Sequence, residues 1–248
     1  MLFRSLGRDF DLTLLSFNLG ALVEDFDAAI ALIRATDADI VALQELGPQS
    51  AAALATAFAE QYSHQALHPH PAVTVGQGLL SKFPVIEDEF WRYEFLPAAL
   101  GHQRAVLETP RGRLVLYNVH PTHPAMQGSF FDPSWRGREV DDLIARASAE
   151  TDPVLLAGDF NLTDTTEDYA RLATVFSDAY RAVGWGLGWT FPANSSSLQL
   201  TFSRLPAVPV FPLLRLDYIF ARGLTPRAAR VLADVTGSDH LALWAALR

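Results

Sequence analysis

The chain has 248 residues, of which 50% are hydrophobic, and it contains no cysteine, so disulfides and thiolate metal sites are excluded. No apolar run approaches the ~20 residues that a membrane-spanning helix needs. The formal net charge is −9, and Lys82 is the only lysine. Proteins that grip duplex nucleic acid by charge carry a basic footprint, and this chain does not show one globally.

The chain is expected to form one domain. Residues 1–10 contain two arginines but no apolar stretch, which predicts an N-terminal tail rather than a signal peptide. No linker, repeat or charge run interrupts residues 11–248, so a single domain is expected over this range. The chain is also expected to be a monomer. Localisation is left open: cytoplasmic, or extracytoplasmic if an export or anchor segment precedes this chain.

The first half of the chain predicts strands that alternate with helices. Strands are expected at 12–18, 39–45, 73–81 and 85–95, and helices at 26–35 and 48–60. Three histidines, His64, His68 and His70, fall between these elements. Two prolines accompany them and no carboxylate is near, so a surface loop is favoured over a metal cluster.

The second half predicts a hairpin of strands 104–108 and 114–120, then a helix at 134–149 with acidic and basic faces, taken to lie on the surface. Further strands are expected at 154–159, 214–220 and 241–247, and a helix at 166–175. Residues 184–212 form a long irregular segment with two tryptophans and four prolines. A segment of that length is usually functional or mobile.

Polar side chains occur where the predicted strands end or begin, and this pattern indicates a site. The apolar run 154–157 stops at Gly158-Asp159-Phe160-Asn161, which a turn alone would also explain. The same event recurs at Asn18, Glu45 and His120, and Asp239 and His240 precede the last strand. Asp217 instead lies inside an apolar strand, which costs energy unless its carboxylate has a partner. Ligand sites in layered α/β proteins lie at strand ends, and clustered carboxylates ionise together only beside a cation. Oxygen-rich ligands favour Mg²⁺ or Mn²⁺.

Seven short motifs, in this order, resemble the endonuclease/exonuclease/phosphatase superfamily, which includes deoxyribonuclease I-like enzymes. They are Ser16-Phe17-Asn18, Leu43-Gln44-Glu45, residues 78–84 (Gly-Leu-Leu-Ser-Lys-Phe-Pro), Asn118-Val119-His120, Gly158-Asp159-Phe160-Asn161, Asp217-Tyr218-Ile219 and Ser238-Asp239-His240. Each motif is weak alone, but seven in order across nearly the whole chain are specific. The resemblance implies an α/β fold, a four-layer αββα sandwich of two mixed β-sheets flanked by helices.

The resemblance also implies a metal and its ligands. Glu45 is expected to be the main ligand of Mg²⁺ (or Mn²⁺), with Asn18 on the same side and Asp239 as a further metal-associated carboxylate. The implied partner is a phosphate-ester substrate.

The remaining matched residues are expected to act on the phosphate. Asp159 would orient or deprotonate the attacking water, and Asn161 and His120 would contact phosphate oxygens. His240 would contact the phosphate as an imidazolium favoured by Asp217. Phosphoryl transfer needs this combination of an in-line nucleophile and positive charge around the equatorial oxygens.

Two further residues are candidates for substrate binding. Arg104 opens a strand and could reach a phosphate, or it could be an edge arginine satisfied by neighbouring carboxylates. Trp189 could contact substrate, although core or loop packing is the commoner role of Trp185 and Trp189. A local arginine patch could also rebuild a nucleic-acid groove, with candidates Arg204, Arg215, Arg222, Arg227 and Arg230.

Three function classes therefore compete. The first is a divalent-metal-dependent phosphoesterase whose substrate is small or lipid-like. The second is a DNA or RNA nuclease of the same chemistry, which the acidic balance disfavours. The third is a non-catalytic binding domain, which the intact set of matched polar residues disfavours.

Overall fold

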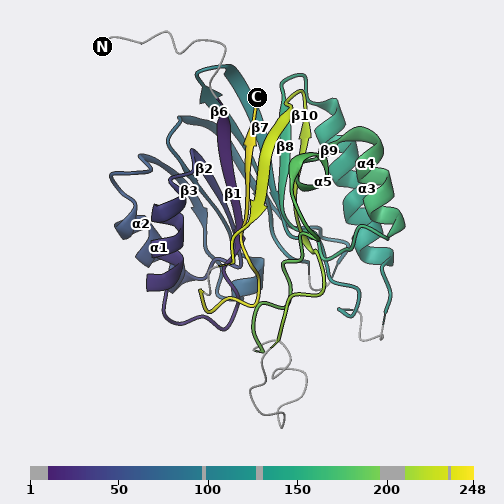
Figure 1. The fold of residues 1–248 in the computed structure, drawn as a ribbon, viewed down its shortest axis with the longest axis horizontal. Coiled ribbons are helices and arrows are strands. Elements are labelled where there is room, and N and C mark those ends of the chain that lie inside the picture. The colour runs from purple at the N-terminus through teal and green to yellow at the C-terminus, as the bar shows by residue number, and fades with distance from the viewer. Residues whose placement is uncertain (1–10, 97–98, 127–130, 196–209, 234–235) are drawn as a thin grey trace.

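The computed structural model describes residues 11–96, 99–126, 131–195, 210–233 and 236–248, which form two mixed six-stranded β-sheets (Figure 1). The expected tail 1–10, Gly128 to Phe130 and Arg204 lie outside this range. The first sheet has the order β11 (Pro226–Val231), β12 (Leu243–Leu247), β1 (Leu12–Asn18), β2 (Ile40–Gln44), β4 (Gln77–Ser81) and β3 (His64–His68). The second has the order β5 (Val85–Trp91), β6 (His102–Thr109), β7 (Gly112–Val119), β8 (Val154–Asp159), β10 (Asp217–Arg222) and β9 (Ser177–Asp178).

Helices cover the outer face of each sheet, so the predicted four-layer αββα fold is confirmed (Figure 1). The helices are α1 (Asp27–Thr36) and α2 (Pro48–Ala57) on the first sheet and α3 (Ser134–Ala149) and α4 (Glu167–Val175) on the second. A short helix α5 (Ala179–Val183) and a 3₁₀ turn η1 (Val73–Val75) complete the elements. None of the described helices combines the length and apolar character needed to cross a bilayer.

Alternating side chains on the central strands build the layers. On β1, Leu12 and Leu14 enter the core between the sheets, whereas Leu15 and Phe17 pack towards α1 and α2. This period of two is what a strand buried on both faces requires. Ser16 and Asn18 share the inner face with Leu14, so the polar end of β1 points between the sheets.

Several sequence-based expectations are corrected. Residues 64–68 form the edge strand β3 rather than a loop, and β11 was not predicted at all. The expected strand 73–81 begins with η1, and the expected strand 214–220 begins only at Asp217. Helix α3 is not simply a surface helix, because Arg136, Glu139 and Leu143 on one stripe are buried.

The parallel pairs in the two sheets bring the site together. β1 and β2 are parallel, as are β7 and β8, so each pair ends at one edge of its sheet. β10 is antiparallel to β8 and begins at that edge, with Asp217 opposite Asp159. The two edges coincide: Gln44 Nε2 donates to Asn118 Oδ1 across the sheets at 2.7 Å, and both residues are buried. We call this shared edge the site edge.

Candidate active site

The carboxylate of Asp159 lies at the end of β8, where Gly158 lets the strand approach β7 closely. Gly158 has φ +148°, and a Cβ there would lie 1.9 Å from the carbonyl oxygen of Val119. Only glycine fits this position without moving backbone. Beyond the strand, the backbone N–H of Asn161 donates to Asp159 Oδ1 at 2.9 Å and fixes the carboxylate.

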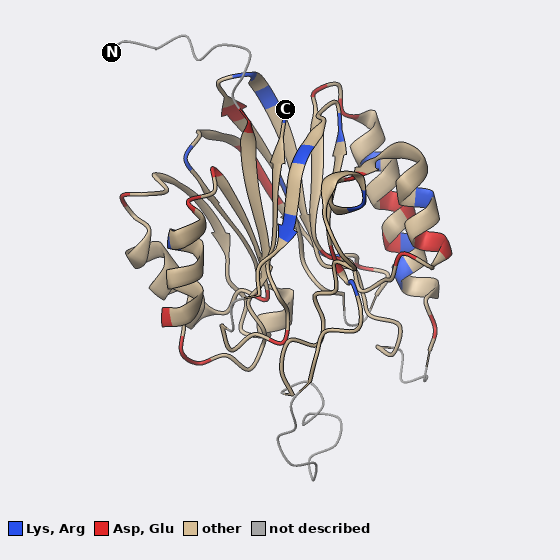
Figure 2. Ribbon diagram, in the orientation of Figure 1, with Lys and Arg blue, Asp and Glu red and all other residues tan. Residues whose placement is uncertain are grey.

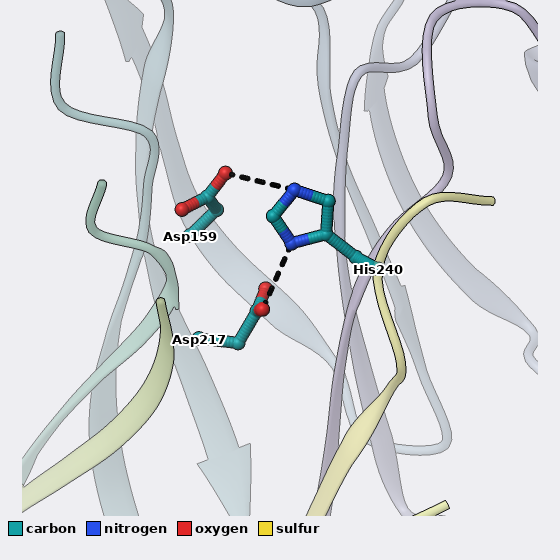
Figure 3. Close-up of side chains that lie close together, drawn as sticks. All are labelled: Asp159, Asp217 and His240. Carbon is teal, nitrogen blue, oxygen red and sulfur yellow. Dashed lines mark hydrogen bonds and ion pairs between the residues drawn. The ribbon is translucent and has the colours of Figure 1, made fainter. Parts of the chain in front are cut away.

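His240 lies between two carboxylates from the second sheet (Figure 3). Its Nδ1 is 2.9 Å from Asp217 Oδ2, and its Nε2 is 3.5 Å from Asp159 Oδ2. All three side chains are buried. This trio has the spacing of a metal site. Because both imidazole nitrogens face carboxylates, however, the positive charge here is His240 itself, as an imidazolium.

The pKa values agree with this charge assignment. Burial opposes a charged imidazole, but the carboxylates of Asp217 and Asp159 outweigh it and raise the pKa of His240 to about 10. Burial also opposes ionisation of Asp159, yet the charge of His240 and the hydrogen bond of His120 lower its pKa to about 2. Asp159 is therefore an ionised carboxylate at neutral pH, between two imidazoles.

His120 approaches the same carboxylate from β7. Its Nε2 is 3.5 Å from Asp159 Oδ2, and its Nδ1 has no hydrogen-bond partner in the described part of the chain. Burial works against the charged form, but Asp159 overcomes it and raises the pKa of His120. The site thus has two imidazoles whose pKa values are shifted towards the charged form, which suits an anionic ligand.

Asn18 joins the two sheets but is not oriented as a metal ligand. Its Oδ1 accepts from the N–H of Gly20 at 3.0 Å. Its Nδ2 therefore faces the carboxylates, 3.3 Å from Glu45 Oε1 and 3.2 Å from Asp159 Oδ2. An amide N–H₂ group donates hydrogen bonds and does not bind a cation. In this arrangement Asn18 positions Glu45 and Asp159, and its role as a metal ligand stays a prediction.

The donor set around Glu45 fits a divalent cation. Glu45 and Asp239 line one cavity of about 150 Å³, and neither forms an ion pair with a lysine or arginine among the described residues. Burial raises the pKa of Glu45, and although His120 and His240 oppose this, Asp239 and Asp159 add to it. Carboxylates packed in this way are ligands that Mg²⁺ and Mn²⁺ accept, and a cation would relieve their repulsion.

Two residues of the site have left-handed backbone. Glu45 has φ +58° and Asn161 has φ +51°, each directly after or near the end of a strand. Such values are uncommon outside glycine and are often found at functional sites. Asn161 uses its Nδ2 to donate to the carbonyl of Pro121 at 2.9 Å, which ties the loop after β8 to the loop after β7.

Arg104 and Trp189, the two other candidates for substrate binding, lie in different environments. Arg104 is committed to carboxylates, with Nε 2.7 Å from Glu150 Oε1 and Nη1 2.8 Å from Glu87 Oε2. These contacts agree with the alternative of a satisfied edge arginine, and a phosphate contact of Arg104 stays a prediction. Trp189 is 39% exposed and immediately precedes Thr190, so it remains near the site but its contact with substrate stays a prediction.

Two arginines of the expected patch are committed to contacts within the protein. Arg215 is buried and pairs with Asp178 at 2.8 Å. Arg222 donates to the backbone carbonyls of Ala147 and Glu150. These two side chains are thus used inside the fold, whereas Arg227 and Arg230 on β11 are exposed.

Four residues that hold the site were not identified from the sequence. Thr190 Oγ1 accepts from the N–H of Leu216 at 3.2 Å. Ser238 Oγ donates to the carbonyl of Asn18 and accepts from the N–H of His240, which fixes the loop before β12. The other two lie on α3: Arg136 and Glu139.

Arg136 and Glu139 contact the backbones of two site loops from one buried face of α3. Arg136 Nη1 donates to the carbonyl of Asn161 at 2.5 Å, and its Nε donates to Asp168 at 2.7 Å. Glu139 Oε2 accepts from the N–H of Thr122 at 2.6 Å, two residues after His120. Arg136 and Glu139 lie on the same helical stripe as the buried apolar residues of α3, and this spacing could have identified them from the sequence.

The four-layer fold and the strand-end cluster of carboxylates and imidazoles are what the resemblance to a family of phosphate-ester hydrolases predicted. The sequence profile of the Endonuclease/Exonuclease/phosphatase family matches residues 15–240, and the chain belongs to this family. No curated protein sequence matches the chain.

Solved structures share the fold. An endonuclease/exonuclease/phosphatase from Beutenbergia cavernae DSM 12333 is 23% identical with TM-score 0.73, covering 96% of this chain and 71% of that chain. A mannosyl-6-phosphatase from Bacteroides thetaiotaomicron VPI-5482 is 18% identical with TM-score 0.71, and the match covers 96% of this chain and 99% of that chain. TDP2 from D. rerio, complexed with a single-strand DNA product, is 19% identical with TM-score 0.73, and the match covers 97% of this chain and 100% of that chain.

Proposed function

We propose that this protein is a divalent-metal-dependent phosphoesterase that hydrolyses a small or lipid-like phosphate ester by in-line attack of water. One observation carries the proposal: ionised Asp159 is fixed between His120 and His240, each 3.5 Å away, with Asn18 linking it to Glu45. A nucleophile-activating carboxylate, positive charge for the phosphate and a carboxylate ligand for a cation therefore lie within one site.

Asp159 orients the water and takes its proton as the new P–O bond forms. His240 and His120 lower the pKa of Asp159 against the effect of burial, so the carboxylate is ionised and able to accept the proton. The bond from phosphorus to the leaving group breaks opposite the water. His240 and His120 offset the charge of the phosphate oxygens, and Asp217 keeps His240 protonated.

Glu45 and Asp239 would hold the metal. A Mg²⁺ or Mn²⁺ ion held there would supply positive charge close to the phosphate. A pocket of about 390 Å³ adjoins Glu45, bordered by Val23, Phe26 and Pro48, and it leaves room for the body of the substrate beside the phosphate.

Two structural neighbours mark the range of substrates to be tested. One is described as a mannosyl-6-phosphatase and the other is complexed with a single-strand DNA product. A nuclease is the second candidate, but the net charge of −9 and the internal use of Arg215 and Arg222 disfavour a long nucleic-acid track.

The test is a substrate panel at matched concentrations: a sugar phosphate, bis(p-nitrophenyl) phosphate, a lipid phosphate, single-stranded DNA and plasmid. Each is assayed with Mg²⁺, with Mn²⁺ and after removal of metal by EDTA. We expect metal-dependent release from a small or lipid-like ester at the highest kcat/KM. Fastest cleavage of plasmid with a steep salt dependence would support the nuclease instead, and no hydrolysis of any member would support a binding domain.

A further inference from the structure

The pocket beside Glu45 is continuous with the cavity that the two proposed metal ligands share. The pocket of about 390 Å³ and the cavity of about 150 Å³ are both lined by Gly20, Ala21, Val23 and Glu45. Asp239 lines the smaller cavity. A molecule that occupies both spaces would therefore have one end at the proposed metal ligands and its other end in the pocket.

The fold holds this pocket open without a ligand. Gly47 lines it, and a Cβ there would lie 3.0 Å from Val73 Cγ2, so only glycine leaves this part of the pocket free. The N–H of Leu46 donates to the carbonyl of Gly76, and the N–H of His70 donates to the carbonyl of Leu46, each at 3.0 Å. Two of the walls are thus fixed to each other, and a ligand binds without first ordering them.

The inner walls of the pocket offer apolar contact. Val23, Phe26 and Val73 line it with half-buried side chains. The hydroxyl that lines it, Ser50 Oγ, is already used within the protein, because it accepts from the N–H of Gly47 and donates to the carbonyl of Gly47, each at 3.0 Å. These walls therefore favour a hydrocarbon group over one that needs hydrogen bonds.

The charge that borders the pocket is negative. Among the residues that the structure describes, the charged ones that line it are Glu24 and Glu45, and the nearby His70 does not line it. Residues 19–33 and 35–81, which supply the walls, contain no lysine or arginine, and Figure 2 shows red but no blue in the loop that leads into α1. A further anionic group on a ligand would meet like charge with no cationic side chain of these walls to offset it.

We propose that this pocket binds the organic part of the substrate and selects phosphate esters of uncharged, largely apolar alcohols over esters whose organic part carries a further anionic group. The proposal rests on the proposed function for the position of the phosphate, at His120 and His240, but recognition of the organic part can be measured without turnover. The pocket has the volume of about a dozen water molecules, which admits a ring or a short chain. Sugar bisphosphates, and nucleic-acid strands that continue through the pocket, carry the second negative charge that the walls disfavour.

The experiment titrates the full chain, in saturating Mg²⁺, with alkylphosphonates, whose C–P bond resists hydrolysis. Isothermal titration calorimetry gives the Kd of methyl-, butyl- and hexylphosphonate, and of 6-phosphonohexanoate, in which a carboxylate ends the chain. We expect affinity to rise about two- to fourfold with each added methylene. We expect 6-phosphonohexanoate to bind at least about tenfold more weakly than hexylphosphonate.

Two variants locate this selectivity in the pocket. Phe26→Ser removes an apolar wall at the N-cap of α1, a position that suits serine, and should lower the ratio of hexyl to methyl affinity about five- to tenfold. Gln49→Lys adds a positive charge at the exposed rim and should raise the affinity for 6-phosphonohexanoate, relative to hexylphosphonate, about tenfold. Thr56→Lys is the matched control, because Thr56 is exposed on the same helix and does not line the pocket. It should leave both ratios at their wild-type values.

Three outcomes would overturn the pocket proposal. No phosphonate binds, or methyl- and hexylphosphonate bind equally, or wild type prefers 6-phosphonohexanoate. Ratios that neither Phe26→Ser nor Gln49→Lys changes would also overturn it, since the organic group would then bind elsewhere. The expected binding pattern in a protein that hydrolyses no member of the substrate panel would instead contradict the proposed function and leave the pocket standing.

Discussion

The amide of Asn18, at the end of β1, donates to the carboxylate of Asp159, at the end of β8, over 3.2 Å. The two residues are 141 positions apart in the chain and belong to different sheets. Their contact connects the proposed metal ligand Glu45 with the proposed water-activating carboxylate. The catalytic arrangement therefore depends on how the two sheets pack, as well as on the motifs at each strand end.

Asp217 and His240 are expected to act as a unit. Their side chains are 2.9 Å apart and buried, so removing either leaves the other without its partner. We expect Asp217→Asn and His240→Gln each to lower kcat/KM by about 10²-fold or more, and the double variant to lose little beyond the worse single variant. A double-mutant cycle measures this, and additive losses would rule the pairing out.

Arg136 is expected to position Asn161 without touching substrate. Arg136→Lys keeps the charge but loses the guanidinium group, whose two nitrogens donate to Asp168 and to the carbonyl of Asn161 at the same time. We expect kcat to fall about tenfold while KM changes little, because the misplaced group is needed mainly in the transition state. Steady-state kinetics on the best substrate of the panel provide the measurement.

Arg171 is the matched control for this position. It also pairs with Asp168, at 2.6 Å, but its other contacts are to Asp141 and the carbonyl of Gly137, away from the site. Arg171→Lys should therefore keep wild-type kcat. Equal losses in both variants, in proportion to lowered thermal stability, would show that Arg136 serves only the fold.

Glu45 is expected to set the concentration of Mg²⁺ that the enzyme needs. Glu45→Gln removes one carboxylate from the cavity shared with Asp239, so half-maximal activity should require at least about tenfold more Mg²⁺. Glu24→Gln is the control, since Glu24 is an exposed carboxylate bordering the neighbouring pocket. An unchanged Mg²⁺ titration for Glu45→Gln would remove Glu45 from the metal site.

The pair of Arg104 and Glu150 is expected to stabilise the fold and not the reaction. The hydrogen bond from Arg104 lowers the pKa of Glu150. A lowered pKa means that this stabilisation is complete above the unfolded-state pKa, about 4.3, and is lost as pH falls through the folded-state value. Glu150→Gln should cost about 1 kcal/mol of unfolding free energy at pH 7 and less at pH 3.

Urea unfolding at the two pH values measures this difference, and Arg104→Gln should retain kcat/KM. A large loss of kcat/KM in a stable Arg104→Gln protein would restore the phosphate contact that the sequence suggested for this residue.

The sequence predicts the central parts of the fold because buried strands carry a readable signal. β1, β2 and β8 are apolar runs that end in a polar residue, β7 is followed directly by His120, and the structure places these ends together. The edge strands β3 and β11 are missed for a physical reason. Each has a single neighbour, and β3 begins and ends in histidine while β11 begins with proline and holds two arginines.

The supporting contacts of the site are less accessible to sequence reasoning. Thr190 lies in an irregular segment with no periodic pattern, and its hydrogen bond to the N–H of Leu216 depends on that segment's path. The orientation of the Asn18 amide depends on the N–H of Gly20, which a motif does not specify. Core or loop packing was expected for Trp185, but its side chain is almost fully exposed, because nothing in an irregular segment fixes which side chains face the protein.

The most direct test of the central claim is the turnover of Asp159→Asn on the best substrate with saturating Mg²⁺. The amide keeps the shape of the side chain and loses the charge that accepts the water proton. The account predicts that kcat falls by about 10²- to 10⁴-fold, while circular dichroism and the melting temperature show a folded protein. Wild-type turnover by folded Asp159→Asn would contradict the assignment of Asp159 as the water-activating group.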